Sequence, residues 1–271
     1  MMPFDVTKPN IARIYDYWLG GKDNFEADRQ AAEAVRGQRP DVADLALENK
    51  KFLTRAVTYV AAHGVRQFLD IGSGLPTSPV REEGAAPLWL STHEAARAVI
   101  PDAVVAYVDY DPVAVLHSQV LLASSSGQVV AVGGDMRDPQ AILTHPGIRG
   151  AGFSPTAPAC VILGCVLHFL DPGAAKGVVA AFAQGLAPGS YVIISVGYGD
   201  GPAGNDFADT YNAQDGSRIY SHSREEISAL FGGLEVVPPG IVDASAWRPE
   251  WPETARSERA AMILAGVGRR A

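Results

Sequence analysis

Apolar side chains recur every three to four positions from about residue 41 to residue 63, and this spacing predicts one long helix that ends at Gly64. Beyond it, short apolar runs alternate with helical segments. The predicted strands cover 67–71, 103–109, 128–132, 159–166, 190–196, 234–237 and 260–266. The other predicted helices cover about 26–36, 91–100, 111–123, 139–145, 171–186 and 223–231. This alternation is typical of an α/β fold, with a mostly parallel sheet between two layers of helices.

The segment before the first strand predicts a cap of helices. A short helix is expected between residues 8 and 21, because Gly20 and Gly21 take the conformation that ends a helix at low cost. We therefore divide the chain into an N-terminal helical cap, 1–64, and a ligand-binding domain, 65–271. Two stretches rich in Gly and Pro or Asp, 75–90 and 199–216, predict long loops beside the site.

The composition and net charge of the chain limit the classes of binding partner that we expect. The 271 residues are 47% hydrophobic and carry a net charge of −8, so neither nucleic acid nor an anionic membrane is an expected partner. Cys160 and Cys165 lie in one apolar run and predict buried thiols, with no metal site. No secretory signal and no apolar run of about 18 residues is present, which favours a cytoplasmic protein. The oligomeric state is not predicted.

Glycine and acidic residues follow the first strands of the predicted sheet. In an open parallel sheet, ligands bind beyond the carboxyl ends of the strands, where the strand order reverses. Asp at a strand end also serves as a turn former or helix cap, and Asp111 is predicted to cap a helix. Three such aspartates beside a glycine loop nevertheless favour a ligand site. The residues expected to contact the ligand are Asp70, Gly72, Ser73, Gly74, Asp109, Tyr110, Asp135, Met136 and Gly164.

The acidic residues suggest which ligand this is. Asp109 ends the second strand, where a carboxylate accepts both hydroxyl protons of a ribose. Asp135 ends the third strand and is expected to accept from an adenine amino group, and Asp70 to meet an ammonium group. The chain has no phosphate-binding Gly-Lys-Ser/Thr motif. A cationic ligand without phosphates fits this set, and S-adenosylmethionine is such a ligand.

A nicotinamide-dependent oxidoreductase is the first alternative. The dinucleotide fingerprint requires a third small residue after Gly74, where this chain has Pro76 and Thr77. A protein that binds S-adenosylmethionine or S-adenosylhomocysteine without catalysis is the second alternative, because binding loops and catalytic loops look alike in sequence.

Three segments of the chain resemble the actinobacterial S-adenosyl methyltransferase family. The first is Ile11-Ala-Arg-Ile-Tyr-Asp-Tyr-Trp-Leu-Gly-Gly-Lys-Asp-Asn-Phe25, called the signature segment below. The second is Gln67-Phe-Leu-Asp-Ile-Gly-Ser-Gly-Leu-Pro-Thr77. The third combines Tyr107-Val-Asp-Tyr-Asp-Pro112, Asp135-Met-Arg-Asp-Pro139 and Val166-Leu-His-Phe169. The resemblance extends from Lys8 to about Gly268.

The resemblance implies a class I, Rossmann-like methyltransferase with seven strands, of which the last is antiparallel. It implies S-adenosylmethionine as the cofactor, S-adenosylhomocysteine as the product, and a signature segment that folds over the cofactor. Cofactor contacts are therefore also expected from Tyr17, Gly21, Lys22 and Asn24. The chain departs from the family at Ser91 or Thr92, where an Asn is usual before His93 and Glu94.

Methyl transfer from a sulfonium depends chiefly on positioning, and a base is needed only where the acceptor atom must lose a proton. His168, after the fourth strand, is the first candidate base, and His93 is the second. Tyr15 and Tyr198 are expected to line the acceptor site. The sequence thus predicts a methyltransferase that uses S-adenosylmethionine and acts on a small molecule.

Overall fold

The computed structural model describes residues 5–77, 87–123, 127–199, 212, 218–249 and 263–271. Most of the loop predicted at 199–216 and the middle of the loop predicted at 75–90 lie outside these residues.

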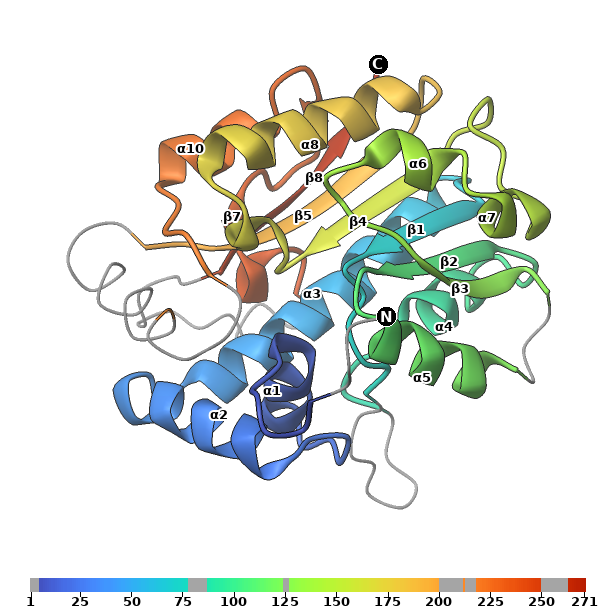
Figure 1. Cartoon of the computed structure of the whole chain (residues 1–271). Coiled ribbons are helices and arrows are strands. Elements are labelled where there is room, and N and C mark those ends of the chain that lie inside the picture. The colour runs from blue at the N-terminus through green and yellow to red at the C-terminus, as the bar shows by residue number, and fades with distance from the viewer. Residues whose placement is uncertain (1–4, 78–86, 124–126, 200–211, 213–217, 250–262) are drawn as a thin grey trace.

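The described strands form one twisted sheet in the order β3-β2-β1-β4-β5-β8-β6, and β7 pairs with β8 (Figure 1). Neighbouring strands from β3 to β5 are parallel, whereas β8 is antiparallel to β5, β6 and β7. The strands are β1 Gln67–Ile71, β2 Val104–Asp109, β3 Val129–Gly133, β4 Cys160–Gly164, β5 Tyr191–Gly197, β6 Glu235–Val236, β7 Val242–Asp243 and β8 Ile263–Arg269. The mostly parallel sheet and the antiparallel last strand are confirmed.

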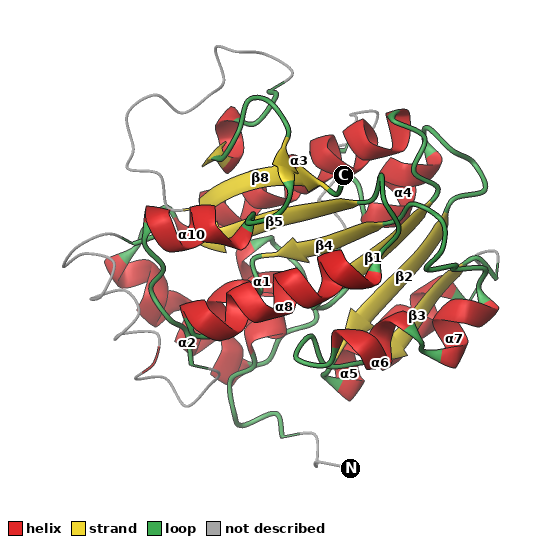
Figure 2. Ribbon diagram, turned by 90° about the horizontal axis from the view of Figure 1, so that it is seen from above, coloured by secondary structure: helices red, strands yellow, loops and turns green. Residues whose placement is uncertain are grey.

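Helices cover both faces of the sheet, as the alternation predicted (Figure 2). The helices are α1 Ile11–Trp18, α2 Glu26–Gln38, α3 Val42–Ala62, α4 Thr92–Arg97, α5 Pro112–Leu122, α6 Pro139–Leu143, α7 Pro146–Gly150, α8 Pro172–Gly185 and α10 Arg224–Leu230. Two 3-10 turns, η1 Leu167–Phe169 and η2 Ala244–Ala246, complete the described elements.

Side chains alternate between the two faces of each strand, so the side chains of one strand pack into two hydrophobic cores. On β4, Val161 and Leu163 join the core under α6, α7, α8 and α10. Cys160 and Ile162 join the core under α3 and α4. Because both faces are covered, β4 is apolar throughout, which is why its sequence predicted a central strand.

The sequence missed only short elements. α7 is a single turn that begins at Pro146, where the side chain of His145 accepts from the amide of Gly147. β7 spans two residues and forms because the chain returns to the antiparallel edge at β8. It brings the described strands to eight, against seven expected. Segments this short carry too few positions for a periodic pattern.

The N-terminal helices are joined by a buried ion pair. The Arg13 guanidinium Nε lies 2.7 Å from Asp28 Oδ2, and both side chains are almost fully buried. Asn10 caps α1 and its amide also donates to Asp28. α1 and α2 therefore form one unit, which lies beside α3 (Figure 1).

We predict that Trp247→Ala will lower the free energy of unfolding by about 3–5 kcal/mol, because it removes a large buried side chain. Trp247 is fully buried and packs edge-on against Phe52 and Tyr59, with ring centroids at 5.5 and 5.8 Å. Chemical denaturation measures the effect. Leu116→Ala, at a side chain that is 59% exposed, is the control and should change stability by about 0.5 kcal/mol or less. Equal losses in both variants would refute the prediction.

Candidate functional site

The strand order reverses between β1 and β4, and a cavity of about 390 Å³, the main cavity, opens at the carboxyl ends of these strands. This is the place where open α/β sheets bind ligands. The expected residues that line the main cavity are Asp70, Gly72, Ser73, Gly74, Asp109, Tyr110, Asp135, Met136 and Gly164.

The glycine loop runs from β1 into the floor of this cavity. Gly72 has φ of +65°, and a Cβ at this position would lie 2.5 Å from Cγ1 of Val166. Its amide donates to the carbonyl of Val108 at 2.7 Å. Only glycine meets both constraints, the left-handed backbone and the close approach to the chain after β4.

Asp109 ties this loop to the end of β2. Its Oδ2 accepts from the amide of Gly74 at 2.8 Å, and its Oδ1 accepts from the amide of Asp111 at 2.9 Å. Burial raises the pKa of Asp109 above the ordinary value of 3.8, although these backbone donors oppose the shift. The side chain is 6% exposed and lines the main cavity, so a ligand there meets a buried acidic group.

A second buried acid, Asp70, lies at the end of β1. Its Oδ2 accepts from the hydroxyl of Thr92 at 2.6 Å, and burial raises its pKa above the ordinary value. The nearby Lys50 ammonium acts in the opposite direction. Thr92 and Ser91 lie where the family usually has an Asn. Ser91 forms the capping box of α4 with Glu94.

Lys50 is a residue of this cavity that the sequence analysis missed. It projects from α3, where burial lowers the pKa of its ammonium group. The ammonium lies over the rings of Tyr15 and Trp89, at 5.8 and 5.5 Å from their centroids. Lys50 and Asp70 therefore set a positive and a negative group against the same cavity.

Asp135 at the end of β3 has a different environment. Both of its carboxylate oxygens accept from Arg137 Nε at 2.9 Å, and this contact lowers the pKa of Asp135. The side chain is 39% exposed, so Asp135 stays ionised at the rim of the main cavity.

Asp16 organises the signature segment. Its carboxylate accepts from the amide of Asp23 and the side-chain amide of Asn24, both at 3.0 Å, and from the hydroxyl of Thr77 at 2.5 Å. A Cβ on Gly21 would lie 2.0 Å from Asp16 Oδ1, so a larger residue there would displace this carboxylate. The segment is thus bound to the chain beyond the glycine loop, and Asp16 itself lines the main cavity.

Other expected contacts from the signature segment lie elsewhere. The described residues that line the main cavity do not include Tyr17, Gly21, Lys22 or Asn24. Lys22 is exposed, and the hydroxyl of Tyr17 donates to Glu33 at 2.9 Å. Gly21 and Asn24 instead hold Asp16 in place. Helix α1 turns its other face, including Asn10, Ile11 and Tyr15, toward the cavity.

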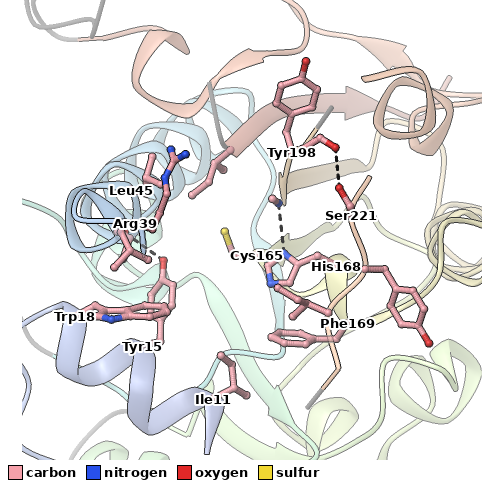
Figure 3. Close-up of a pocket in the computed structure, with 17 residues that line it drawn as sticks. Ile11, Tyr15, Trp18, Arg39, Leu45, Cys165, His168, Phe169, Tyr198 and Ser221 are labelled. Carbon is pink, nitrogen blue, oxygen red and sulfur yellow. Dashed lines mark hydrogen bonds between the residues drawn. The ribbon is translucent and has the colours of Figure 1, made fainter. Parts of the chain in front are cut away.

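A smaller side chamber of about 130 Å³ adjoins the main cavity. Figure 3 shows Tyr15 and Trp18 on one side of it and His168 and Phe169 on the other. Both of the residues expected at the acceptor site, Tyr15 and Tyr198, line this chamber. The main cavity and the side chamber share a wall formed by Ile11, Tyr15, Cys165, Phe169 and Tyr220.

The two candidate histidines lie in different places. His168 lines the side chamber, and burial together with the neighbouring His222 lowers its pKa to about 4. His93 is absent from the described residues that line either cavity. Its Nδ1 lies 2.8 Å from the hydroxyl of Tyr107, and its backbone amide donates to the same oxygen at 3.0 Å. His93 therefore holds α4 against β2.

A chain of polar groups behind the shared wall was also missed. Asn49 donates to the Tyr15 hydroxyl at 3.0 Å and accepts from Ser195 at 2.7 Å. Cys165, at the end of this chain, has a left-handed backbone with φ of +53°. Asn49 lies one turn from Leu45 and from Phe52 on the apolar stripe, and this polar interruption was the signal available in the sequence.

The model of the S-adenosyl methyltransferase family matches residues 2–271, so the chain belongs to this family. It is a methyltransferase that depends on S-adenosylmethionine, which decides against the oxidoreductase alternative. No curated protein sequence matches the chain.

Two solved structures resemble the whole molecule. One is a proposed methyltransferase from Thermobifida fusca, 39% identical, with a TM-score of 0.87 over 98% of this chain and 96% of that one. The other is a DUF574 family protein from Streptomyces avermitilis, 35% identical, with a TM-score of 0.87 over 98% and 99%.

A more distant structure shares the fold. It is magnesium protoporphyrin IX methyltransferase from Synechocystis with bound S-adenosylhomocysteine, 14% identical, with a TM-score of 0.54 over 95% of this chain and 93% of that one. The Rossmann-like class of the fold is thereby confirmed. In the part of the chain that the structure describes, no helix has the length and apolar character needed to span a membrane.

We predict that Gly72→Ala will lower the free energy of unfolding by about 1–3 kcal/mol, because the new methyl group meets Val166 on a left-handed backbone. Denaturation of the purified variant measures this. In Gly37→Ala the added methyl group on α2 meets no atom within 4 Å, and a gain of about 0.5–1 kcal/mol is expected there. A Gly72→Ala variant as stable as the parent would contradict the assignment.

Proposed function

We propose that the main cavity binds S-adenosylmethionine and that its methyl group passes to a small-molecule acceptor in the side chamber. The observation that carries this proposal is the wall shared by the two cavities, which lies at the carboxyl ends of β1 and β4. A ligand that fills the main cavity therefore has a second compartment beside it.

The residues of the main cavity fit this cofactor. A volume of about 390 Å³ lies within the range of small-molecule sites. The Asp109 carboxylate has acceptor capacity left for the ribose hydroxyl groups, and Asp135 with Met136 is suited to the adenine ring. When bound, S-adenosylmethionine supplies an electrophilic methyl group.

Lys50 and Asp70 suit the methionine end of the cofactor. Its carboxylate and ammonium groups carry opposite charges, and these two side chains offer the complementary pair on one side of the main cavity. We assign the carboxylate to Lys50 and not to Lys22, because Lys22 is exposed and Lys50 is held within the cavity.

A small-molecule acceptor agrees with the charge and the walls. The net charge of −8 repels nucleic acid, and the side chamber is lined mainly by apolar and aromatic side chains. Of the two candidate histidines, only His168 belongs to the wall of this chamber, so we propose that it contacts the acceptor.

We predict that Asp109→Asn will weaken S-adenosylmethionine binding about 10- to 100-fold, because hydrogen bonds to a charged group are worth about 1.5–3 kcal/mol. Calorimetric titration with S-adenosylmethionine, S-adenosylhomocysteine and NAD measures it. Asp102→Asn, at an exposed acid that pairs with Arg66, is the matched control and should leave the affinity unchanged. An unchanged affinity in Asp109→Asn would refute the ribose assignment, and a parent protein that binds none of the three ligands would refute the site.

The affinity for S-adenosylmethionine should also fall as the pH is lowered from neutrality into the acid range. Burial raises the pKa of Asp109 and Asp70, so each takes up a proton at a higher pH than an ordinary acid and its ionised form is lost on acidification. For each of these groups, the affinity should fall by up to about tenfold for every pH unit below the pKa of the group. Calorimetry across this range tests the slope, which should be shallower in Asp109→Asn. Binding that strengthens on acidification would contradict both assignments.

A further inference from the structure

Aromatic rings form much of the wall of the side chamber. Tyr15 and Trp18 come from α1, and Phe169, Tyr198 and Tyr220 come from the other side. The volume of about 130 Å³ is close to that of an apolar cavity of about 150 Å³ that holds one benzene ring. The chamber therefore matches a single aromatic ring in size and in chemistry.

His168 presents a donor to this chamber. Its Nδ1 accepts a hydrogen bond from the backbone amide of Gly197 at 3.4 Å, so the neutral ring carries its proton on Nε2. The low pKa of about 4 keeps the ring neutral near pH 7. Its ring packs against Phe169 with centroids 4.6 Å apart, and Figure 3 shows its edge facing the space beside Tyr15. Nε2–H is thus available to an acceptor.

Two hydroxyl groups of the wall have committed protons. The Tyr15 hydroxyl donates to the carbonyl of Ala46 at 3.2 Å, and the Ser221 hydroxyl donates to the carbonyl of Gly199 at 2.7 Å. Arg39 is a permanent cation, with its Nε 2.9 Å from Asp41 Oδ1. No carboxylate lines the chamber among the described residues. The two hydroxyl oxygens therefore present lone pairs to the chamber, Nε2–H of His168 is a donor in its wall, and Arg39 is a cation there.

Further titratable groups face His168 from the packed elements. They are Tyr15 of α1, Arg39 before α3, Cys165 after β4, Tyr198 after β5, and Tyr220 and His222 before α10. Burial raises the pKa of the Cys165 thiol to about 11, so it stays protonated. His222 is fully buried, and its Nε2 donates to the carbonyl of Leu170 at 3.1 Å.

We infer that the acceptor is a single-ring phenol that enters the side chamber as the phenolate, and that His168 is a hydrogen-bond donor to its oxygen and not a base. This inference rests on the proposed function. It revises the role expected for His168 from the sequence, because the contact with Gly197 leaves no free lone pair on the ring of the neutral histidine.

The chemistry balances without a base in the chamber. The phenol releases its proton to bulk water before it enters. The phenolate oxygen then forms a bond to the methyl carbon, and the carbon–sulfur bond breaks with its electron pair on sulfur. The products are an aryl methyl ether and S-adenosylhomocysteine. Because an anion and a sulfonium cation neutralise each other in this step, the mainly apolar walls of the chamber favour it.

The absorbance of para-nitrophenol reports its ionisation directly, so it is the probe of choice. We would measure the absorbance of the dye as a function of pH in the presence of protein loaded with sinefungin. Sinefungin is a cofactor analogue with an amine in place of the methylsulfonium group. The bound dye should ionise about 1–3 pH units lower than the free dye, because positive charge and a donor stabilise the anion. Binding of the protonated dye with a raised pKa, or failure of the loaded protein to bind the dye, would overturn the inference.

Two variants separate a donor from a base. His168→Phe removes the donor and should weaken binding of the nitrophenolate about tenfold or more, whereas His168→Gln keeps a donor and should retain most of it. An equal affinity in both variants would overturn the donor role. Neither should change S-adenosylhomocysteine affinity, because His168 does not line the main cavity. Failure to bind S-adenosylhomocysteine would instead count against the proposed function itself.

Discussion

The carboxylate of Asp109 holds the glycine loop in position, and the shape of the main cavity depends on this contact. It receives the amides of Gly74 and Asp111, so one side chain at the end of β2 fixes the turn after β1 and the entry into α5. Burial destabilises the ionised carboxylate of Asp109, and this raises its pKa. A buried acid with unused acceptor capacity, next to a bare glycine backbone, is well prepared for a ligand with two hydroxyl groups.

Helix α1 covers part of this cavity because its two ends are attached to the segments that follow β1 and β2. At one end, the side-chain amide of Asn10 donates to Asp111 at 2.8 Å, and at the other, Asp16 accepts from Thr77. The buried pair of Arg13 and Asp28 adds α2 to the same unit. The signature segment therefore acts largely through its internal contacts, which place Tyr15 in the wall between the main cavity and the side chamber.

The two compartments differ in chemistry, and the difference suits methyl transfer. The main cavity has acids and a lysine for a zwitterionic cofactor, whereas the side chamber has aromatic walls and a histidine. Cys165 lies at their boundary with a left-handed backbone, and such strain is common at functional sites. Its amide donates to Ser195, which links the boundary to Asn49 and hence to Tyr15.

The strands, the main helices and the residues at the strand ends could be predicted from the sequence, because periodicity and glycine placement are local properties. β1 was predicted residue for residue, and the acids at the carboxyl ends of β1, β2 and β3 all line one cavity. Tertiary structure alone decided which face of α1 meets the cavity, that Lys50 rather than Lys22 enters it, and that His93 binds Tyr107 instead. It also decided which nitrogen of His168 is free, since that follows from a contact with Gly197 on a neighbouring strand. The direction in which a side chain points is set by packing between distant segments, and no local pattern encodes it.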